Sequence, residues 1–371
     1  MMRDVKVELY KTKKIVNDHK HSDDGWFWTR YSAIPYKGCV HGCRYCYCWD
    51  EKYAPHKDYT TLDKIIMVKE NAPELLRKEL ARKPREVIAA GDWQPIEAKY
   101  KLSRKMLEVI YQLKFPLMVI ERAPLLCRDL DILSDISAQT DAYVGYTVVT
   151  TKDDDARLHF EPKGPSTKGR FRAMKRIADA GILIGTLAMP IIPHIFDSDE
   201  ELRLLVKMTA DAGGRFVLFG GMTLWGTCKR VFYKALEEFD SSLLGQIDLW
   251  DTNKAKKTQW VRRCHLTIAE ECAKQGILHY IPRPVSFYPP ELQYNKRIAG
   301  KLSLKKRDIE MLGESRYRAA AYSKAVRTID NLLVDIRDIY KEKGRSGLLA
   351  LEGIGEKLAG VIEGMLRDET S

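Results

Sequence analysis

The chain has 371 residues, of which 45% are hydrophobic and 30% are charged, and its formal net charge is +11. This length favours two domains, and this composition excludes a disordered or fibrous chain. The basic excess favours a polyanionic partner such as nucleic acid, although a solvated surface of mixed charge is the alternative. The longest apolar run, residues 181–193, is too short to span a bilayer, so we expect no membrane segment.

The first sixteen residues carry scattered basic side chains and no apolar stretch, which predicts a cytoplasmic chain without a secretory signal. Four of the eight cysteines fall within ten residues, between positions 39 and 48. Disulfide scaffolds spread their cysteine pairs over a short secreted chain. In a reducing compartment, clustered thiols instead indicate metal ligands or redox groups.

The loop at residues 34–49 reads IPYKGCVHGCRYCYCW. Three of its cysteines have the spacing C-x3-C-x2-C: Cys39, Cys43 and Cys46. Gly38 and Gly42 allow the backbone to curl, so that three thiolates can converge on one inorganic centre. Three thiolates leave one iron of a four-iron cluster open for a substrate atom. A zinc site with Cys48 or His41 as the fourth ligand is the alternative.

After this loop, short β-rich apolar runs alternate with amphipathic segments. The expected strands are residues 86–91, 117–121, 143–149, 182–188 and 216–220. The expected helices between them are residues 102–113, 128–136, 171–180 and 200–212. This alternation implies right-handed crossovers and a parallel sheet, and about 250 residues suit a full or partial β/α barrel. Function is then expected on loops at the carboxyl ends of the strands.

The pattern changes after residue 281, where prolines crowd a short stretch and basic residues follow. This composition predicts a linker, and the chain beyond it has the periodicity of helices. We therefore expect four parts. They are an N-terminal extension at 1–30, an α/β core domain at 31–285, a linker at 286–302 and a small all-α domain at 303–371.

The cysteine spacing, with Tyr45 directly before the third cysteine, resembles the signature of the radical S-adenosylmethionine (SAM) superfamily. The stretch 35–38 and Tyr47 resemble more narrowly its spore photoproduct lyase branch. The resemblance implies a partial (β/α)6 barrel in which the three cysteines hold a [4Fe-4S] cluster, its open iron binds SAM, and Tyr45 lies at the cofactor. It also implies reductive cleavage of SAM to a 5'-deoxyadenosyl radical, with electrons from a donor such as a ferredoxin or flavodoxin.

Residues 89–108 resemble the family's acidic turn between a strand and a helix. In the superfamily this turn holds the amino group of SAM, which implies that role for Gly91 and Asp92; the alternative is that Asp92 caps the turn. The resemblance further places Arg157 and Glu161 at the carboxylate and the ribose of SAM. For these two, an ordinary surface pair at helical spacing is the alternative.

Lyases of this branch that split thymine photoproducts carry a hydrogen-donating cysteine just before the turn. This chain has Ala89 and Ala90 there. The resemblance therefore implies the radical machinery without the thymine lesion as substrate. Tyr47 and Cys127 are the candidate hydrogen donors from other walls, although Cys127 is equally explained as a small buried residue at a helix start.

Residues 351–359, LEGIGEKLA, resemble a helix-hairpin-helix motif. The turn formed by Gly353 and Gly355 is expected to present backbone amides at a helix N-terminus to a phosphate, and Lys357 to add a positive charge. A helical hairpin used only for packing is the alternative. Val361 stands where related polymerases with lyase activity carry a lysine, so the resemblance implies binding without that reaction.

Residues 317–329 extend this resemblance to the N-terminal domain of the family X DNA polymerases. Arg316 and Arg318, beside Tyr317 and Tyr322, are the candidate phosphate and stacking contacts, with a plain basic face as the alternative. We therefore expect a radical SAM enzyme that repairs or modifies a base in nucleic acid, DNA rather than RNA. A radical SAM tRNA-modifying enzyme and a non-catalytic iron-sulfur protein that binds nucleic acid are the alternatives.

Overall fold

The computed structural model describes residues 5–22 and 25–368 of the chain. These residues fall into two units. The first comprises residues 5–20 and 29–279, and the second comprises residues 21–22, 25–28 and 280–368. The separate N-terminal extension expected at 1–30 is therefore wrong, because residues 6–10 pair with a strand of the first unit and residues 25–28 belong to the second unit. None of the described helices is long and apolar enough to cross a membrane.

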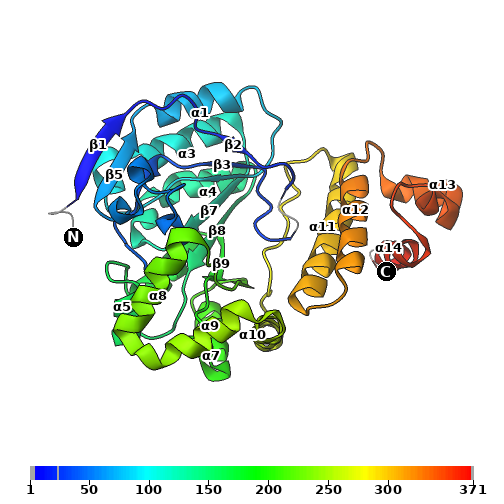
Figure 1. Ribbon diagram of the computed structural model, residues 1–371. Coiled ribbons are helices and arrows are strands. Elements are labelled where there is room, and N and C mark those ends of the chain that lie inside the picture. The colour runs from blue at the N-terminus through cyan, green and yellow to red at the C-terminus, as the bar shows by residue number, and fades with distance from the viewer. Residues whose placement is uncertain (1–4, 23–24, 369–371) are drawn as a thin grey trace. The chain divides into compact units, whose positions relative to one another are not determined.

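A seven-stranded sheet forms the centre of the first unit (Figure 1), in the order β10-β9-β8-β7-β6-β3-β2. Every neighbouring pair from β3 to β10 is parallel, and only the edge strand β2 runs antiparallel. The strands of this sheet are β2 (Asn17–Asp18), β3 (Tyr31–Ala33), β6 (Ile88–Ala90), β7 (Leu117–Glu121), β8 (Ala142–Thr147), β9 (Leu183–Ala188) and β10 (Val217–Phe219). Six parallel strands with helical crossovers give the partial barrel that the sequence predicts.

Helices connect these strands and cover the sheet. Contacts join α3 to β6, α4 to β8, α7 to β9 and α10 to β10. The helices of the first unit are α1 (Ala72–Leu80), α2 (Glu97–Tyr100), α3 (Leu102–Leu113), α4 (Leu130–Gln139), α5 (Asp155–Phe160), α6 (Thr167–Asp179), α7 (Asp199–Asp211), α8 (Gly226–Asp240), α9 (Leu244–Thr252) and α10 (Lys254–Lys274). All five strands and all four helices expected from periodicity are present.

The central strands are buried on both faces, which explains their nearly continuous apolar runs. All six residues of β8 are buried, and the register aligns Val119 of β7, Val144 of β8 and Ile184 of β9. Ser166 fixes the start of α6, where its hydroxyl accepts a hydrogen bond from the Gly169 amide at 3.1 Å. The helix-capping role expected of Ser166 is confirmed.

A second sheet carries the cysteine loop. β1 (Lys6–Tyr10) pairs parallel with β5 (Ile65–Lys69), and β4 (Tyr36–Lys37) pairs antiparallel with the same strand. β4 follows β3 after two residues and leads directly into the loop. The short strand β3 and this small sheet were not expected from periodicity, because two or three residues are too few to show a period. Together they deliver the cysteines to the carboxyl end of β3.

The second unit is entirely helical and has its own core. Its helices are α11 (Pro290–Met311), α12 (Arg316–Asp330), α13 (Ile336–Leu349) and α14 (Glu356–Asp368). Tyr294, Ile298 and Leu302 of α11 pack in one cluster with residues of the other three helices. The linker expected at 286–302 is therefore wrong, because most of it is the first half of a helix whose apolar face is buried. The prolines mark only the segment before that helix.

Candidate active site

The cysteine loop curls at the carboxyl end of β3, at the edge where the other parallel strands also end. Gly38 (φ +89°) and Gly42 (φ +59°) adopt the left-handed conformation, as their use in a curled loop requires. The loop is held in place by backbone groups, since the Cys39 amide donates to the Leu62 carbonyl at 2.8 Å. All the cysteines are free thiols, and Cys43 is buried.

The spacing of the ligand atoms bears on the choice between zinc and an iron-sulfur cluster. The candidate ligands in the loop are Cys39, Cys43, Cys46, Cys48 and His41. Within the described part of the chain, no three of them have their ligand atoms all within 4.8 Å of one another. Tetrahedral zinc with bonds of about 2.3 Å needs sulfurs about 3.8 Å apart. Ligands of a four-iron cube each bind a different iron and stand farther apart. The described cysteine loop is therefore not arranged as a preformed zinc site.

Gln94 clamps the cysteine loop to the turn after β6. Its side-chain carbonyl accepts from the Val40 amide at 3.0 Å, and its amide donates to the Gly38 carbonyl at 3.0 Å and to Asp92 at 2.8 Å. The side chain is 1% exposed, so these bonds replace solvent completely. The sequence reasoning missed Gln94, because only the fold brings it to residues more than fifty positions earlier.

Asp92 follows Gly91 at the end of β6 and is only half-buried. Its carboxylate accepts from the Gln94 amide at 3.0 Å, which confirms the turn-capping alternative. Burial raises the pKa of Asp92 to about 7, and the nearby Glu121 carboxylate adds to this effect. Because both effects disfavour the charged form of Asp92, a cation that binds beside it would stabilise the carboxylate. Capping thus leaves open the ammonium contact expected of Gly91 and Asp92, which stays a prediction.

Two further buried carboxylates fix the same strand end. Glu121, at the end of β7, accepts from the Trp93 amide at 2.7 Å and from the Ala123 amide at 2.9 Å. Glu97 is fully buried, accepts from Tyr36 of β4, and pairs with Arg128 at 2.7 Å. These contacts join β4, β6, β7 and the residues before α4, so the edge beside the cysteine loop is held as one unit.

Arg122, the residue after β7, brings a guanidinium to the cysteines. Its Nη1 lies 3.0 Å from the Cys43 sulfur, 3.0 Å from the Tyr45 hydroxyl and 2.9 Å from Glu161. Tyr45 is buried and donates to the same Glu161 carboxylate. Burial raises the pKa of Tyr45, so its phenol keeps its proton. Sequence reasoning missed Arg122, although its place directly after a predicted strand was the available signal.

Glu161 lies between two arginines. It is 0% exposed and pairs with Arg170, which is also fully buried, as well as with Arg122. Burial alone would raise the pKa of Glu161, but the two guanidinium groups more than offset this and keep it below its ordinary value. The carboxylate therefore positions Arg122 and Tyr45 at the cysteine loop. Its contact with a ribose stays a prediction.

Arg157 lies on α5, one turn before Glu161. It is 4% exposed, its Nε lies 2.9 Å from Asp153, and its Nη1 lies 3.9 Å from Glu161. The alternative of a surface pair is wrong, because both Arg157 and Glu161 are buried. The expected contact of Arg157 with the cofactor carboxylate stays a prediction, and Arg122 stands nearer to the cysteines.

The two candidate hydrogen donors have different surroundings. Tyr47 is 50% exposed in a 3₁₀ turn of the cysteine loop, with its ring 5.2 Å from that of Tyr53. Cys127 is buried, and its thiol donates to the Ala173 carbonyl of α6 at 3.7 Å. The interpretation of Cys127 as a small packed residue is thus confirmed. Ala89 and Ala90 are the last residues of β6, directly before the Gly91 turn.

In the second unit, the turn between α13 and α14 carries the phosphate-binding candidates. Gly353 has φ +77°, and the Glu352 carbonyl beside it accepts from Thr328 of α12 at 2.7 Å. Gly355 directly precedes α14, and Lys357 lies exposed in its first turn. Val361 packs against the helical core, so no reactive group replaces the missing lysine.

The basic candidates on α12 lie near its start. Tyr317 is 77% exposed, with the Arg316 guanidinium 5.4 Å from its ring. Arg318 pairs with Glu314 at 2.5 Å, which leaves its charge partly compensated. Tyr322 is 6% exposed and belongs to the core of the unit, so the suggestion that it stacks on a base is wrong. Tyr317 is the aromatic residue available for stacking at this end of α12.

Comparison with known proteins matches part of each unit to a family model. Residues 33–206 match the family model described as Radical SAM superfamily, and residues 293–371 match that of a helix-hairpin-helix domain. An uncharacterised protein of Mycobacterium tuberculosis is 29% identical over 212 residues, which cover 55% of this chain and 62% of that protein. One of Methanocaldococcus jannaschii is 28% identical over 195 residues, 52% of this chain and 71% of the relative. The chain thus spans less than two thirds of the mycobacterial relative.

Solved structures resemble the fold. A cysteine-to-serine mutant of spore photoproduct lyase has a TM-score of 0.53 at 16% identity, covering 74% of this chain and 80% of the lyase. A tyrosine-to-phenylalanine mutant gives the same TM-score and coverage at 15% identity. A radical SAM domain implies a [4Fe-4S] cluster and SAM as cofactors, and the cysteine loop offers three free thiols as ligands for that cluster. The chain combines a domain of the radical SAM superfamily with a C-terminal helix-hairpin-helix domain.

Proposed function

We propose that this chain is a radical SAM enzyme that repairs or modifies a base in nucleic acid, with DNA as its substrate. The observation that carries this proposal is the joining, in one chain, of a three-cysteine loop at the carboxyl edge of a parallel sheet to a hairpin with a glycine turn. The first feature suits radical chemistry, and the second suits a sugar-phosphate backbone. Because Ala89 and Ala90 replace the hydrogen-donating cysteine, we propose a base other than a thymine photoproduct.

The residues of the first unit divide the work of holding the cofactors. Cys39, Cys43 and Cys46 would hold the cluster, which on reduction supplies a 5'-deoxyadenosyl radical from SAM. Asp92 would accept from the ammonium group of SAM, and Arg122 would hold its carboxylate, because a guanidinium forms two parallel hydrogen bonds with a carboxylate. Both groups lie beside the cysteine loop: Asp92 accepts from Gln94, which also holds the loop, and Arg122 contacts the Cys43 sulfur directly.

The second unit would hold the substrate strand. Amides at the start of α14 have no carbonyl partner within the helix, so they can donate to a phosphate. Lys357 is exposed next to them, and Tyr317 offers a flat exposed ring. Backbone contacts of this kind bind without reading sequence, and the sheet-edge site would then select the base.

The test is anaerobic reconstitution with iron and sulfide, followed by reduction with dithionite in the presence of SAM. We expect about four irons per chain and release of 5'-deoxyadenosine. Cys43→Ala is the matched control and should lose both. A reconstituted protein that binds nucleic acid but never cleaves SAM would leave only an iron-sulfur binding protein. Competition between DNA and tRNA for retention decides the substrate, and preference for tRNA would replace DNA by RNA in the proposal.

A further inference from the structure

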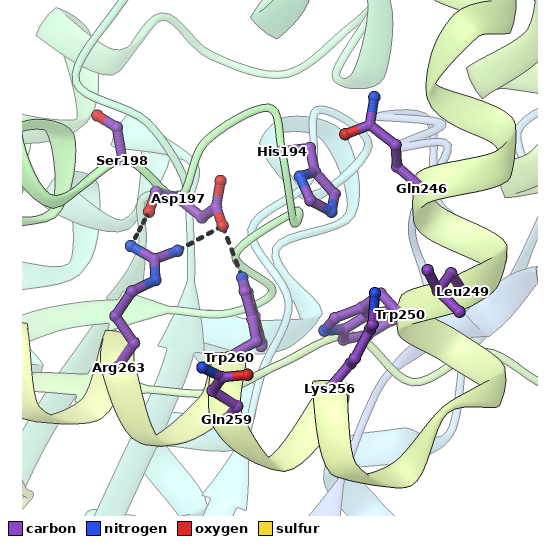
Figure 2. A pocket seen from close by; sticks show the side chains of 10 residues that line it. All are labelled: His194, Asp197, Ser198, Gln246, Leu249, Trp250, Lys256, Gln259, Trp260 and Arg263. Carbon is purple, nitrogen blue, oxygen red and sulfur yellow. Dashed lines mark hydrogen bonds and ion pairs between the residues drawn. The ribbon is translucent and has the colours of Figure 1, made fainter.

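A cavity of about 790 Å³ lies in the first unit, away from the cysteine loop in sequence. Figure 2 shows its three walls: α9 supplies Gln246, Leu249 and Trp250, α10 supplies Lys256, Gln259, Trp260 and Arg263, and the loop between β9 and α7 supplies His194, Asp197 and Ser198. That loop follows the carboxyl end of β9, the edge at which substrates of such barrels bind. The volume is that of a site for a small organic ligand.

The floor of this cavity is aromatic. The rings of Trp250 and Trp260 lie 5.3 Å apart at an angle of 81°. Trp260 donates its indole hydrogen to Asp197 at 2.6 Å, but the nitrogen of Trp250 has no hydrogen-bond acceptor among the described residues. Trp250 is 3% exposed, so this donor is also cut off from water. Leu249, 43% exposed, extends the apolar surface at the rim.

Polar side chains around the mouth are also unpaired. In the described part of the structure, Gln246, Gln259 and His194 have no side-chain hydrogen bond, and all three are exposed. Each glutamine offers both a donor and an acceptor, which is the combination that the edge of a nucleobase requires. His194 is held at φ +64°, an uncommon conformation for a residue other than glycine.

The end of the cavity at Lys256 favours an anion. Arg263 is neutralised by Asp197 and Asp199, each at 2.6 Å. Lys256 is exposed and has no carboxylate partner among the described residues. It lies in the first turn of α10, a helix of 21 residues, so its charge adds to the partial positive charge of the helix N-terminus. A phosphate is therefore the group most suited to this end of the cavity.

We infer that this cavity holds one unpaired nucleotide of the substrate strand, with its base against Leu249 at the rim of the buried Trp250–Trp260 pair and its phosphate at Lys256. The inference rests on the proposed function, since it takes nucleic acid to be the substrate. The glutamines then contact the base edge. A base turned out of its stack is the form in which an enzyme can reach its atoms.

The test uses the full chain with a single-stranded oligonucleotide that carries one iodinated uracil. Long-wavelength irradiation should cross-link that base to the peptide spanning residues 244–263. Lys256→Glu should weaken retention of the strand about tenfold at low salt and reduce this cross-link. Lys105→Glu, the same charge change at an exposed position of α3, is the control and should behave as the wild type.

The outcomes separate this inference from the proposed function. If the strand binds and cross-links map only outside residues 244–263, or Lys256→Glu retains the strand as well as Lys105→Glu does, the cavity is not the nucleotide site, while the proposed function stands. If Lys256→Glu instead loses SAM binding in the absence of nucleic acid, the cavity belongs to the cofactor and the inference is overturned. If the wild type retains neither DNA nor tRNA, both fail together.

Discussion

Replacing Glu161 by glutamine removes one charge from the buried group that supports the cysteine loop. The carboxylate is 0% exposed and neutralises Arg170, which is itself fully buried, together with Arg122, whose side chain is 18% exposed. Glutamine has the same size but leaves the Arg170 guanidinium without a counter-charge and directs an N–H group toward another donor. Arg122 can turn partly to water, so the main loss falls on Arg170.

The expected cost of Glu161→Gln is about 3–5 kcal/mol, the range for removing one partner of a buried ion pair. This is a large part of the roughly 5–15 kcal/mol that stabilises a typical domain. Glu238→Gln is the matched control, because Glu238 pairs with Arg44 at 2.6 Å but is 45% exposed. A pair of that kind contributes less than about 1 kcal/mol.

Urea unfolding of the two variants, followed by circular dichroism, measures this difference. With a slope of roughly 3 kcal/mol/M, Glu161→Gln should lower the urea midpoint by about 1–1.7 M and Glu238→Gln by less than about 0.3 M. The difference in unfolding free energy between wild type and Glu161→Gln should become smaller in acid. The pKa of Glu161 is lowered by folding, so its carboxylate stabilises the fold fully above the unfolded pKa of 4.5. This stabilisation is lost as the pH falls through the folded pKa. Equal midpoints for the two variants at neutral pH would refute the role given to Glu161.

Three further changes probe the cysteine loop. Gln94→Leu keeps the side-chain volume but leaves the Val40 amide and the Gly38 carbonyl unpaired, at a cost of about 1–3 kcal/mol each. The amount of iron bound per chain after reconstitution should therefore fall. A normal iron content would show that the Gln94 contacts are dispensable. Arg122→Lys keeps the charge but loses the paired donors, so SAM binding by equilibrium dialysis should weaken about tenfold while iron content is kept, and unchanged binding would argue against the carboxylate contact. Cys48→Ala should retain the full iron content in a colorimetric assay. A lower iron content in this variant would show that Cys48 is also a ligand.

How much of this architecture the sequence predicts depends on the length of each element. Strands such as β8 and helices such as α6 are long enough to show a period, and Ser166 marks a helix start through ordinary capping chemistry. β3 has three residues and β4 two, so neither can show one. The linker was misplaced because prolines before α11 signal a break, whereas the burial of α11 depends on partners far along the chain.

The candidate site divides along the same line. The cysteines could be found because three ligands on one loop are a local pattern. Arg122, Gln94 and Arg170 could not be assigned in this way. Gln94 and Arg122 act on residues 54 and 79 positions earlier, and Arg170 acts on a carboxylate that only the fold buries. Glu161 was found by resemblance, but its neighbours in space give it a positioning role that no sequence spacing reveals.

The glycine turn of the hairpin offers two neighbouring positions that separate folding from binding. Gly353 has φ +77°, and a Cβ there would lie 2.6 Å from Cγ of Lys324. Gly353→Ala should therefore destabilise the second unit by about 1–2 kcal/mol, even if the flexible lysine moves aside. At Gly355 a Cβ would meet nothing within 4 Å and the backbone conformation is ordinary, so Gly355→Ala should leave the melting temperature unchanged.

Binding tells the two roles of the turn apart. If the amides beside Gly355 approach a phosphate closely, an added methyl group obstructs that approach although the protein folds normally. Gly355→Ala should then lower retention of single-stranded DNA about tenfold at low salt, whereas Gly353→Ala lowers both retention and melting temperature. If Gly355→Ala binds DNA as the wild type does, the turn serves packing only. Phosphate recognition would then have to come from elsewhere on the chain.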